Sequence, residues 1–183
     1  MTIKQLSILA AIGILTGCAQ GDDTSKETAS AASVDDVVLE LPADYKASGP
    51  YLISDRLGQE DQVIALFANA TARDGARADG KLPYGSIIVG EIYGVEKDAD
   101  GEVVESQLGR RVPAELKTIV MMERREGWDA RYPDELKVGD WEFEVFSPAG
   151  ENLGKDTTAC RECHHPLTET EFTWSYQHLA AAN

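Results

Sequence analysis

Hydrophobic and polar positions divide the chain into an apolar N-terminal run, a short polar stretch and a long remainder with strand-like patterns. In the remainder, runs rich in β-branched and aromatic residues predict strands at residues 62–67, 86–95 and 116–124. Residues 141–145, Trp-Glu-Phe-Glu-Val, alternate strictly between apolar and acidic positions. This alternation predicts an antiparallel strand with one buried and one exposed face.

Helices are predicted between and after these strands. Asn69 or Thr71 is suited to cap a short Ala/Arg-rich helix that runs through Ala78. Further helices are expected near residues 160–166 and over residues 169–181. Strands first and helices at the end predict an α+β fold, with a mainly antiparallel β-sheet and short flanking helices.

A hairpin is predicted between the second and third of these strands. Residues 98–101, Asp-Ala-Asp-Gly, have the composition of a hairpin turn, and residues 102–106 are the expected return segment.

The N-terminal run has the pattern of an export signal. Lys4 provides a basic start, and residues 6–15 are apolar but too few to span a bilayer as a mature helix. Leu15-Thr16-Gly17-Cys18 follows at once and resembles the bacterial lipobox. We therefore expect residues 1–17 to be a lipoprotein signal peptide and Cys18 to be lipidated. An ordinary secretory signal with an incidental cysteine is the alternative.

The residues after Cys18 predict how the chain is held at the membrane. Residues 18–36 are small and polar and bury too little apolar surface to fold, so they are expected to form a flexible tether ahead of one folded domain over 37–183. Ala19 stands where an aspartate would favour retention at the inner membrane of enteric bacteria. The predicted location is therefore the periplasmic side of the cell envelope, with the outer membrane favoured.

The charge of the chain restricts its partners. The 183 residues include 32 Asp and Glu against 17 Lys and Arg, a net charge of −15. Such a surface repels phosphate backbones, so nucleic acid is not expected as a partner, whereas a basic redox protein is compatible.

The segment Cys160-Arg161-Glu162-Cys163-His164 carries the most specific chemistry in the sequence. Two cysteines three residues apart share one face of a helical turn, where their sulfurs can join the two vinyl groups of one haem. The adjacent histidine then ligates the iron. The three cysteines of the chain are thereby assigned, one to lipid and two to a single covalent haem c. Haem attachment of this kind occurs outside the cytoplasm, in agreement with the predicted export.

Two other interpretations of the cysteines remain open. A structural zinc site needs four ligands, and the only other nearby nitrogen donors are His165 and His178. A redox-active dithiol is typical of a βαβ pattern, which the sequence lacks.

The sixth position on the iron is the next question. Met121 and Met122 alternate on a predicted strand, so one of them faces inward, where it can ligate iron or simply fill the core. His165 is adjacent to the proximal ligand and cannot reach the far side of the same iron. His178 fits a surface position or one behind the ligands. We therefore expect a five-coordinate haem with an open distal side.

Several segments, taken in order, resemble the cytochrome P-460 family, which also includes the cytochromes c-prime-beta. The ordered set, including the Phe-Thr after the haem motif, is more specific than any member except the haem motif. The resemblance implies a mainly antiparallel β domain with haem held against the sheet, His164 as proximal ligand, and often a homodimer. The matching segments are Leu41-Pro42-Ala43-Asp44-Tyr45, Phe67-Ala68-Asn69, residues 82–91, Gly139-Asp140-Trp141-Glu142-Phe143, the haem motif and Glu171-Phe172-Thr173.

The chain departs from the family's hydroxylamine-oxidising members at two positions. Where the resemblance places a lysine cross-linked to haem, this chain has Gly90, which has no amine. The enzyme's distal carboxylate aligns near the apolar Ile119, with Glu123 as a possible substitute. The other lysines near these segments fit solvated turns or strand ends; they are Lys81, Lys97 and Lys117.

These departures favour the c-prime-beta branch, in which an apolar pocket admits nitric oxide or a similar small neutral ligand. The candidate wall residues are Phe67, Ile88, Ile119 and Met121, each of which can equally belong to the core of the sheet. Two other functions stay open. One is an oxidoreductase acting on hydroxylamine or nitric oxide, and the other is a simple electron-transfer cytochrome with Met121 or Met122 on the iron.

Overall fold

The computed structural model describes residues 38–78 and 81–182. The predicted signal peptide (1–17), Cys18 and the tether (18–36) lie outside the described residues. Within residues 38–78 and 81–182, no helix has both the length and the apolar character that a bilayer-crossing segment requires.

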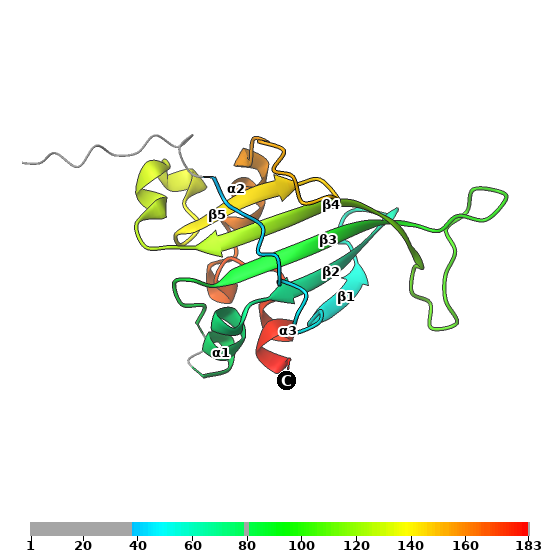
Figure 1. Ribbon diagram of the computed structural model, residues 1–183, viewed down its shortest axis with the longest axis horizontal. Coiled ribbons are helices and arrows are strands. Elements are labelled where there is room, and N and C mark those ends of the chain that lie inside the picture. The colour runs from blue at the N-terminus through cyan, green and yellow to red at the C-terminus, as the bar shows by residue number, and fades with distance from the viewer. Residues whose placement is uncertain (1–37, 79–80, 183) are drawn as a thin grey trace, which may run out of the picture. The chain divides into compact units, whose positions relative to one another are not determined.

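The strands of the described residues form one five-stranded antiparallel sheet, in which neighbours in sequence are also neighbours in space (Figure 1). The four strands predicted from the sequence are present, together with a short first strand that was not predicted. The predicted α+β fold with a mainly antiparallel sheet is confirmed. The strands are β1 (Leu52–Asp55), β2 (Gln62–Ala68), β3 (Ile87–Val95), β4 (Pro113–Arg124) and β5 (Trp141–Phe146).

Short helices precede and follow strands of the sheet. The cap of the first is Asn69, whose Oδ1 accepts hydrogen bonds from the backbone N–H groups of Ala72 (3.0 Å) and Ile87 (3.1 Å). Among the described residues the α-helices are α1 (Ala70–Ala78), α2 (Thr158–His164) and α3 (Tyr176–Ala181), and the 3-10 helices are η2 (Trp128–Arg131), η3 (Asp134–Leu136) and η4 (Thr168–Thr170).

The C-terminal helix is shorter than the predicted helix over 169–181. Glu171 and Phe172 have φ angles of 51° and 60°, a left-handed conformation that a right-handed helix cannot contain. The helical path is therefore broken, and α3 begins only at Tyr176.

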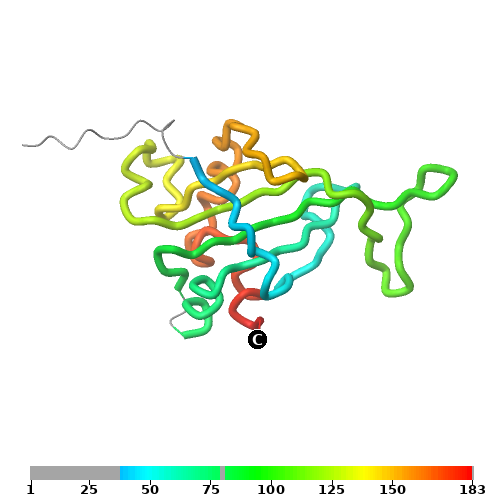
Figure 2. The backbone as a smooth tube through the Cα atoms, viewed as in Figure 1, coloured from blue at the N-terminus to red at the C-terminus, as the bar shows by residue number. Residues whose placement is uncertain are grey.

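The predicted hairpin forms an arm at residues 96–112 that extends away from the sheet (Figure 2). It contains isolated antiparallel bridges, between Lys97 and Val103 and between Glu105 and Arg111, in place of a regular return strand.

The sheet has two buried faces. We call the side packed against α1, α2 and α3 the helix face, and the side crossed by residues 38–50 the opposite face (Figure 1). The strand residues buried on the helix face are Ala68, Ile88, Met122, Trp141 and Phe143. Those buried on the opposite face are Ala65, Phe67, Val89, Ile119, Met121 and Phe146.

A buried carboxylate on β3 holds the crossing segment to the opposite face. Glu91 is only 2% exposed and accepts hydrogen bonds from the hydroxyls of Tyr45 (2.7 Å) and Tyr93 (2.6 Å). Its carboxylate also pairs with Lys46. Burial raises the pKa of Glu91, but the hydrogen bonds from Lys46 and the two tyrosines outweigh it and bring the pKa below its ordinary value. Glu91 is therefore a charged anchor for residues 45–46.

The expectation that β5 has one exposed face is wrong. Glu142 and Glu144 alternate with apolar residues as predicted, yet they are only 4% and 8% exposed. β5 is an edge strand, and side chains from outside the sheet cover it: Tyr132 and Arg161 bind the Glu142 carboxylate. A polar strand pattern indicates an exposed face only where no neighbour supplies such partners.

Candidate haem site

Helix α2 presents the haem motif on one side. Cys160, Cys163 and His164 have the i, i+3, i+4 spacing that places side chains on the same face of a helix. Cys160 packs against the helix-face cluster and Cys163 is exposed. Burial raises the pKa of the Cys160 thiol. The three groups that a covalent haem requires therefore lie together beside the helix face of the sheet.

The imidazole of His164 is oriented by a backbone carbonyl. Its Nδ1 lies 2.6 Å from the oxygen of Phe172. Because a carbonyl oxygen only accepts, Nδ1 carries the proton and donates it, and Nε2 keeps its lone pair for a metal. Burial lowers the pKa of His164, which favours the neutral form that ligates iron. The ring of Phe143 lies beside the imidazole, with 5.0 Å between ring centroids.

The Phe172 carbonyl is in turn fixed by the left-handed pair Glu171-Phe172. The backbone N–H of Phe172 donates to the oxygen of Leu167 at 2.8 Å. The Glu171 carboxylate pairs with Arg124 at 2.7 Å, and the indole N–H of Trp141 donates to the Glu171 carbonyl at 3.1 Å. Non-glycine residues in this backbone region are strained, so these contacts hold a conformation that the chain would not adopt alone.

Gly139 makes room for this turn. A Cβ placed on Gly139 would lie 2.4 Å from the Phe172 ring, and its φ of 67° is itself a conformation that favours glycine. Two segments quoted above for the family resemblance, at residues 139–143 and 171–173, therefore meet directly behind His164. Arg124 adds the third, because it also donates to the carbonyl of Leu82.

The helix face near Gly90 is apolar. Gly90 lies opposite Leu66 of β2 and Val120 of β4, and Val120 lies opposite Val145 of β5. Leu66, Val120 and Val145 are only half-buried. A Cβ on Gly90 would lie 3.0 Å from Val120 and 3.1 Å from Ile64. This apolar surface lies on the same face of the sheet as Cys160. The flat, apolar face of a porphyrin fits such a surface, so the residues present fit a haem.

The candidate distal residues do not share one face. Ile88 lies on the helix face with Cys160. Phe67, Ile119 and Met121 pack together on the opposite face, across the sheet from the haem motif. The structure does not bring these three together with Cys160 and His164, because successive residues of a strand point to opposite sides. Of the two adjacent methionines, Met122 is the one on the helix face.

The possible distal carboxylate is also on the opposite side. Glu123 directly follows Met122 on β4, so its side chain points to the other face of the sheet. Its carboxylate accepts a hydrogen bond from Arg125 at 2.7 Å. The lysines considered for a cross-link are all exposed; they are Lys81, Lys97 and Lys117.

The remaining histidines have other roles. The Nδ1 of His165 lies 2.7 Å from the carbonyl oxygen of Lys137, and His178 is exposed on α3. Within residues 38–78 and 81–182, no three His, Cys, Asp or Glu side chains converge as metal ligands, so the zinc interpretation gains no support.

The sequence did not reveal the part played by Arg161, the first variable residue of the haem motif. Its side chain is buried and bound to Glu142 of β5. Its position, on the side of the helix away from the cysteines, was the available signal.

The Gly139 contact makes a testable prediction. Gly139→Ala forces a Cβ into the Phe172 ring and should lower the free energy of unfolding by about 2–5 kcal/mol, the sum of left-handed backbone strain and overpacking. Gly109→Ala is the matched control, because Gly109 has a φ of 65° but nothing within 4 Å of its Cβ position, and it should cost only about 1–2 kcal/mol. Chemical denaturation measures both. Equal losses of unfolding free energy in the two variants would show that the close contact between Gly139 and Phe172 does not affect stability.

The comparison with known families agrees with this geometry. The family model described as Cytochrome P460 matches residues 42–175, well over half of the chain. No curated protein matches the chain. The chain therefore belongs to the cytochrome P460 family, and this membership indicates a c-type haem protein that binds small ligands.

Proposed function

We propose that the protein is a lipid-anchored periplasmic cytochrome that carries one covalent haem c and binds nitric oxide or a similar small neutral molecule. The observation that carries this proposal is the arrangement on α2: Cys160, Cys163 and His164 share one side of the helix, and the bond from His164 Nδ1 to the Phe172 carbonyl leaves the Nε2 lone pair for a metal. The proposal narrows the general function of the family to an open, ligand-binding iron.

Each residue of the motif has one chemical task. The thiols of Cys160 and Cys163 would each form a thioether with one vinyl group of the haem, with the thiol hydrogen passing to the other vinyl carbon. The Nε2 of His164 would ligate the iron. A bound haem supplies an iron that coordinates small molecules. The Phe172 carbonyl and the Phe143 ring keep the imidazole in one orientation.

Apolar surroundings favour a neutral ligand. The half-buried residues near Gly90 on the helix face are Ile64, Leu66, Val120 and Val145, none of which can replace the hydration of a charged molecule. Nitric oxide and carbon monoxide are neutral and weakly hydrated, so they lose little hydration free energy on entering such surroundings.

A protein ligand in the sixth position is not favoured. Met122 is buried with Trp141 and Phe143, and Phe143 contacts His164 itself. These contacts make Met122 part of the core that holds the imidazole. Met121, on the opposite face of the sheet, is separated from the site by the strands.

Oxidation of hydroxylamine is also disfavoured. Gly90 has no amine for a haem cross-link, and a side chain there would press on Val120 and Ile64. Glu123, the possible proton relay, lies on the opposite face and is paired with Arg125. These contacts support ligand binding over a catalysed oxidation.

Optical spectra of the purified protein test the proposed function. The ferrous protein should show a five-coordinate high-spin spectrum that changes on addition of nitric oxide. His164→Ala should abolish the spectrum of a histidine-ligated haem. His165→Ala, a change at the adjacent histidine, should retain that spectrum. A low-spin spectrum indifferent to added ligand would instead identify an electron carrier, and a red-shifted ferrous Soret band would reveal a lysine cross-link.

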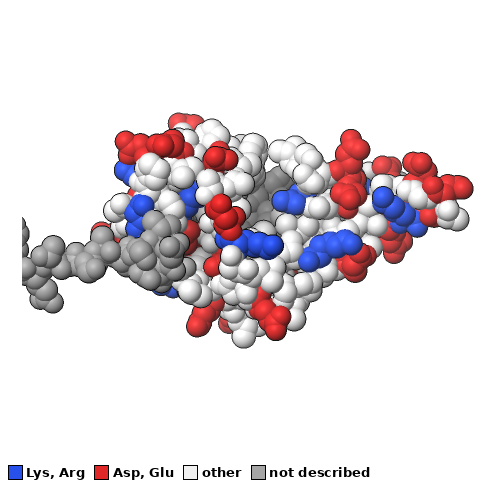
Figure 3. All heavy atoms as spheres, turned by 90° about the horizontal axis from the view of Figure 1, so that it is seen from above, with Lys and Arg blue, Asp and Glu red and all other residues white. Residues whose placement is uncertain are grey.

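The proposed location rests on the sequence around Cys18. The net charge of −15 suits a basic redox partner in the periplasm. On the 96–112 arm, acidic and basic side chains are interspersed (Figure 3). A homodimer is the assembly that the family resemblance implies.

Inhibition of lipoprotein processing tests the anchor. Globomycin should cause the unprocessed precursor to accumulate, because the lipoprotein signal peptidase cleaves only before a diacylated cysteine. Cys18→Ser should give the same precursor without the drug. Unchanged processing in both cases would refute lipidation at Cys18.

A further inference from the structure

Arg161, inside the haem motif, is almost completely buried. Its side chain is 1% exposed, although the neighbouring Glu162 and Cys163 are exposed. Arginine is rarely buried to this extent unless its charge is paired. The burial therefore indicates a specific set of partners.

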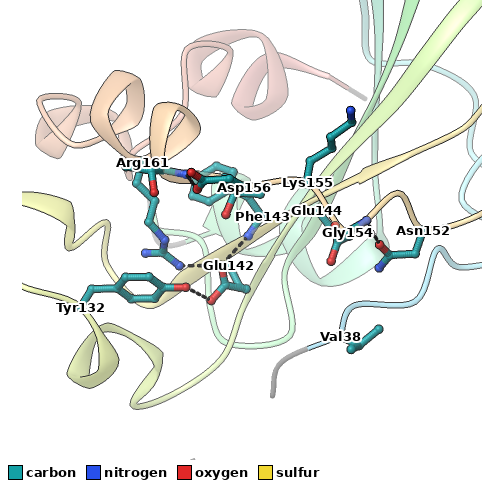
Figure 4. Close-up of a pocket in the computed structure, with 12 residues that line it drawn as sticks. Val38, Tyr132, Glu142, Phe143, Glu144, Asn152, Gly154, Lys155, Asp156 and Arg161 are labelled. Atoms are coloured by element: carbon teal, nitrogen blue, oxygen red, sulfur yellow. Dashed lines mark hydrogen bonds and ion pairs between the residues drawn. The ribbon is translucent and has the colours of Figure 1, made fainter. Parts of the chain in front are cut away.

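Those partners come from β5 and from the segment before it (Figure 4). The Nη2 of Arg161 donates to Oε1 of Glu142 at 2.7 Å and to the carbonyl of Trp141 at 2.9 Å. The guanidinium carbon lies 3.3 Å from the centroid of the Tyr132 ring. The Tyr132 hydroxyl completes the cluster by donating to Oε2 of Glu142 at 2.7 Å.

The cluster holds the side of α2 that faces away from the haem groups. A helix turns by about 100° per residue, so Arg161 and His165 form a row that is offset from the row of Cys160 and His164. His165 strengthens this row by bonding to the carbonyl of Lys137. One side of the helix is thus attached to the protein, and the other side is left for the cofactor.

Phe143 connects the two sides. Its ring lies 5.7 Å from the Arg161 guanidinium carbon and 5.0 Å from the centre of the His164 imidazole. A rotation of α2 that moved Arg161 away from Glu142 would also change how His164 lies against Phe143.

Stability alone does not account for a buried arginine here. Removing a charge from water has a large free-energy cost, and apolar residues of similar size often stabilise such positions equally well or better. Among the described residues, the buried Nε of Arg161 has no hydrogen-bond partner, which adds to the cost. The planar guanidinium provides directional hydrogen bonds, which fix one orientation of Arg161 relative to Glu142.

We propose that Arg161 is a positioning residue that, with Glu142 and Tyr132, fixes the rotation of α2 against β5 and so sets the orientation of the His164 imidazole on the iron. This proposal rests on the proposed function, since it requires a haem on His164.

The iron–histidine stretching band in the resonance Raman spectrum of the ferrous protein reports this orientation directly. Arg161→Lys keeps the charge but loses the planar fork, and Glu142→Gln keeps a hydrogen-bond acceptor but loses the charge. Both should shift the band to lower frequency and broaden it relative to wild type. Tyr132→Phe removes only one hydroxyl and should shift it less.

Glu144→Gln is the matched control. Glu144 lies two residues along the same strand and is also buried, but its carboxylate accepts a hydrogen bond only from the adjacent backbone N–H of Val145 among the described contacts. This variant should leave the band where it is in wild type. If Arg161→Lys fails to fold, Glu142→Gln and Tyr132→Phe still decide the question.

The outcomes separate the two proposals. Variants that melt at lower temperature with an unmoved band would show a structural role only and overturn the positioning role of Arg161, while the haem assignment would stand. A wild-type protein with no pyridine haemochrome would refute the proposed function and, with it, this role.

Discussion

The hydrogen bond from His164 to the carbonyl of Phe172 is the contact on which the candidate site depends. It selects the tautomer with a free Nε2, and it requires a carbonyl at a position that regular structure does not provide. The left-handed conformation of Glu171 and Phe172 supplies that position. Gly139, Trp141 and Arg124 stabilise it, and these residues belong to the sheet or to the turn before it. Residues of the sheet and of the turn before β5 thus hold the Phe172 carbonyl in the position that His164 requires.

The second constraint acts on the helix that carries the histidine. Arg161 and His165 attach α2 to β5 and to the segment before it, while the Phe172 carbonyl holds the imidazole from the other side. A short helix of this kind has little stability of its own. Its orientation must therefore come from such tertiary contacts, and the haem motif accordingly contains a buried arginine that pairs with Glu142 of β5.

The sequence predicted four of the five strands of the described sheet, Asn69 as one of two candidate caps, and the haem motif, because periodicity, capping and ligand spacing are local signals. It did not predict on which face each strand residue lies. Both faces of the sheet are buried, so alternation along β4 could not assign Met121 and Met122 to sides. Glu142 of β5 was misread as exposed because its partners, Tyr132 and Arg161, come from elsewhere in the chain. The role of the Phe172 carbonyl could not be predicted from the sequence, since every residue has a backbone carbonyl.

The central claim is that Cys160 and Cys163 hold a single haem beside a site that has Gly90 in place of a lysine. Intact mass spectrometry of the protein under denaturing conditions, after maturation in a host that assembles c-type cytochromes, tests it most directly. Attachment through two thioethers alone predicts the mass of the polypeptide plus one haem, with both thiols protected from alkylation and no hydrogens lost to a third bond. A mass equal to the bare polypeptide with two alkylated thiols, or a further loss of hydrogens from a lysine bond, would contradict it.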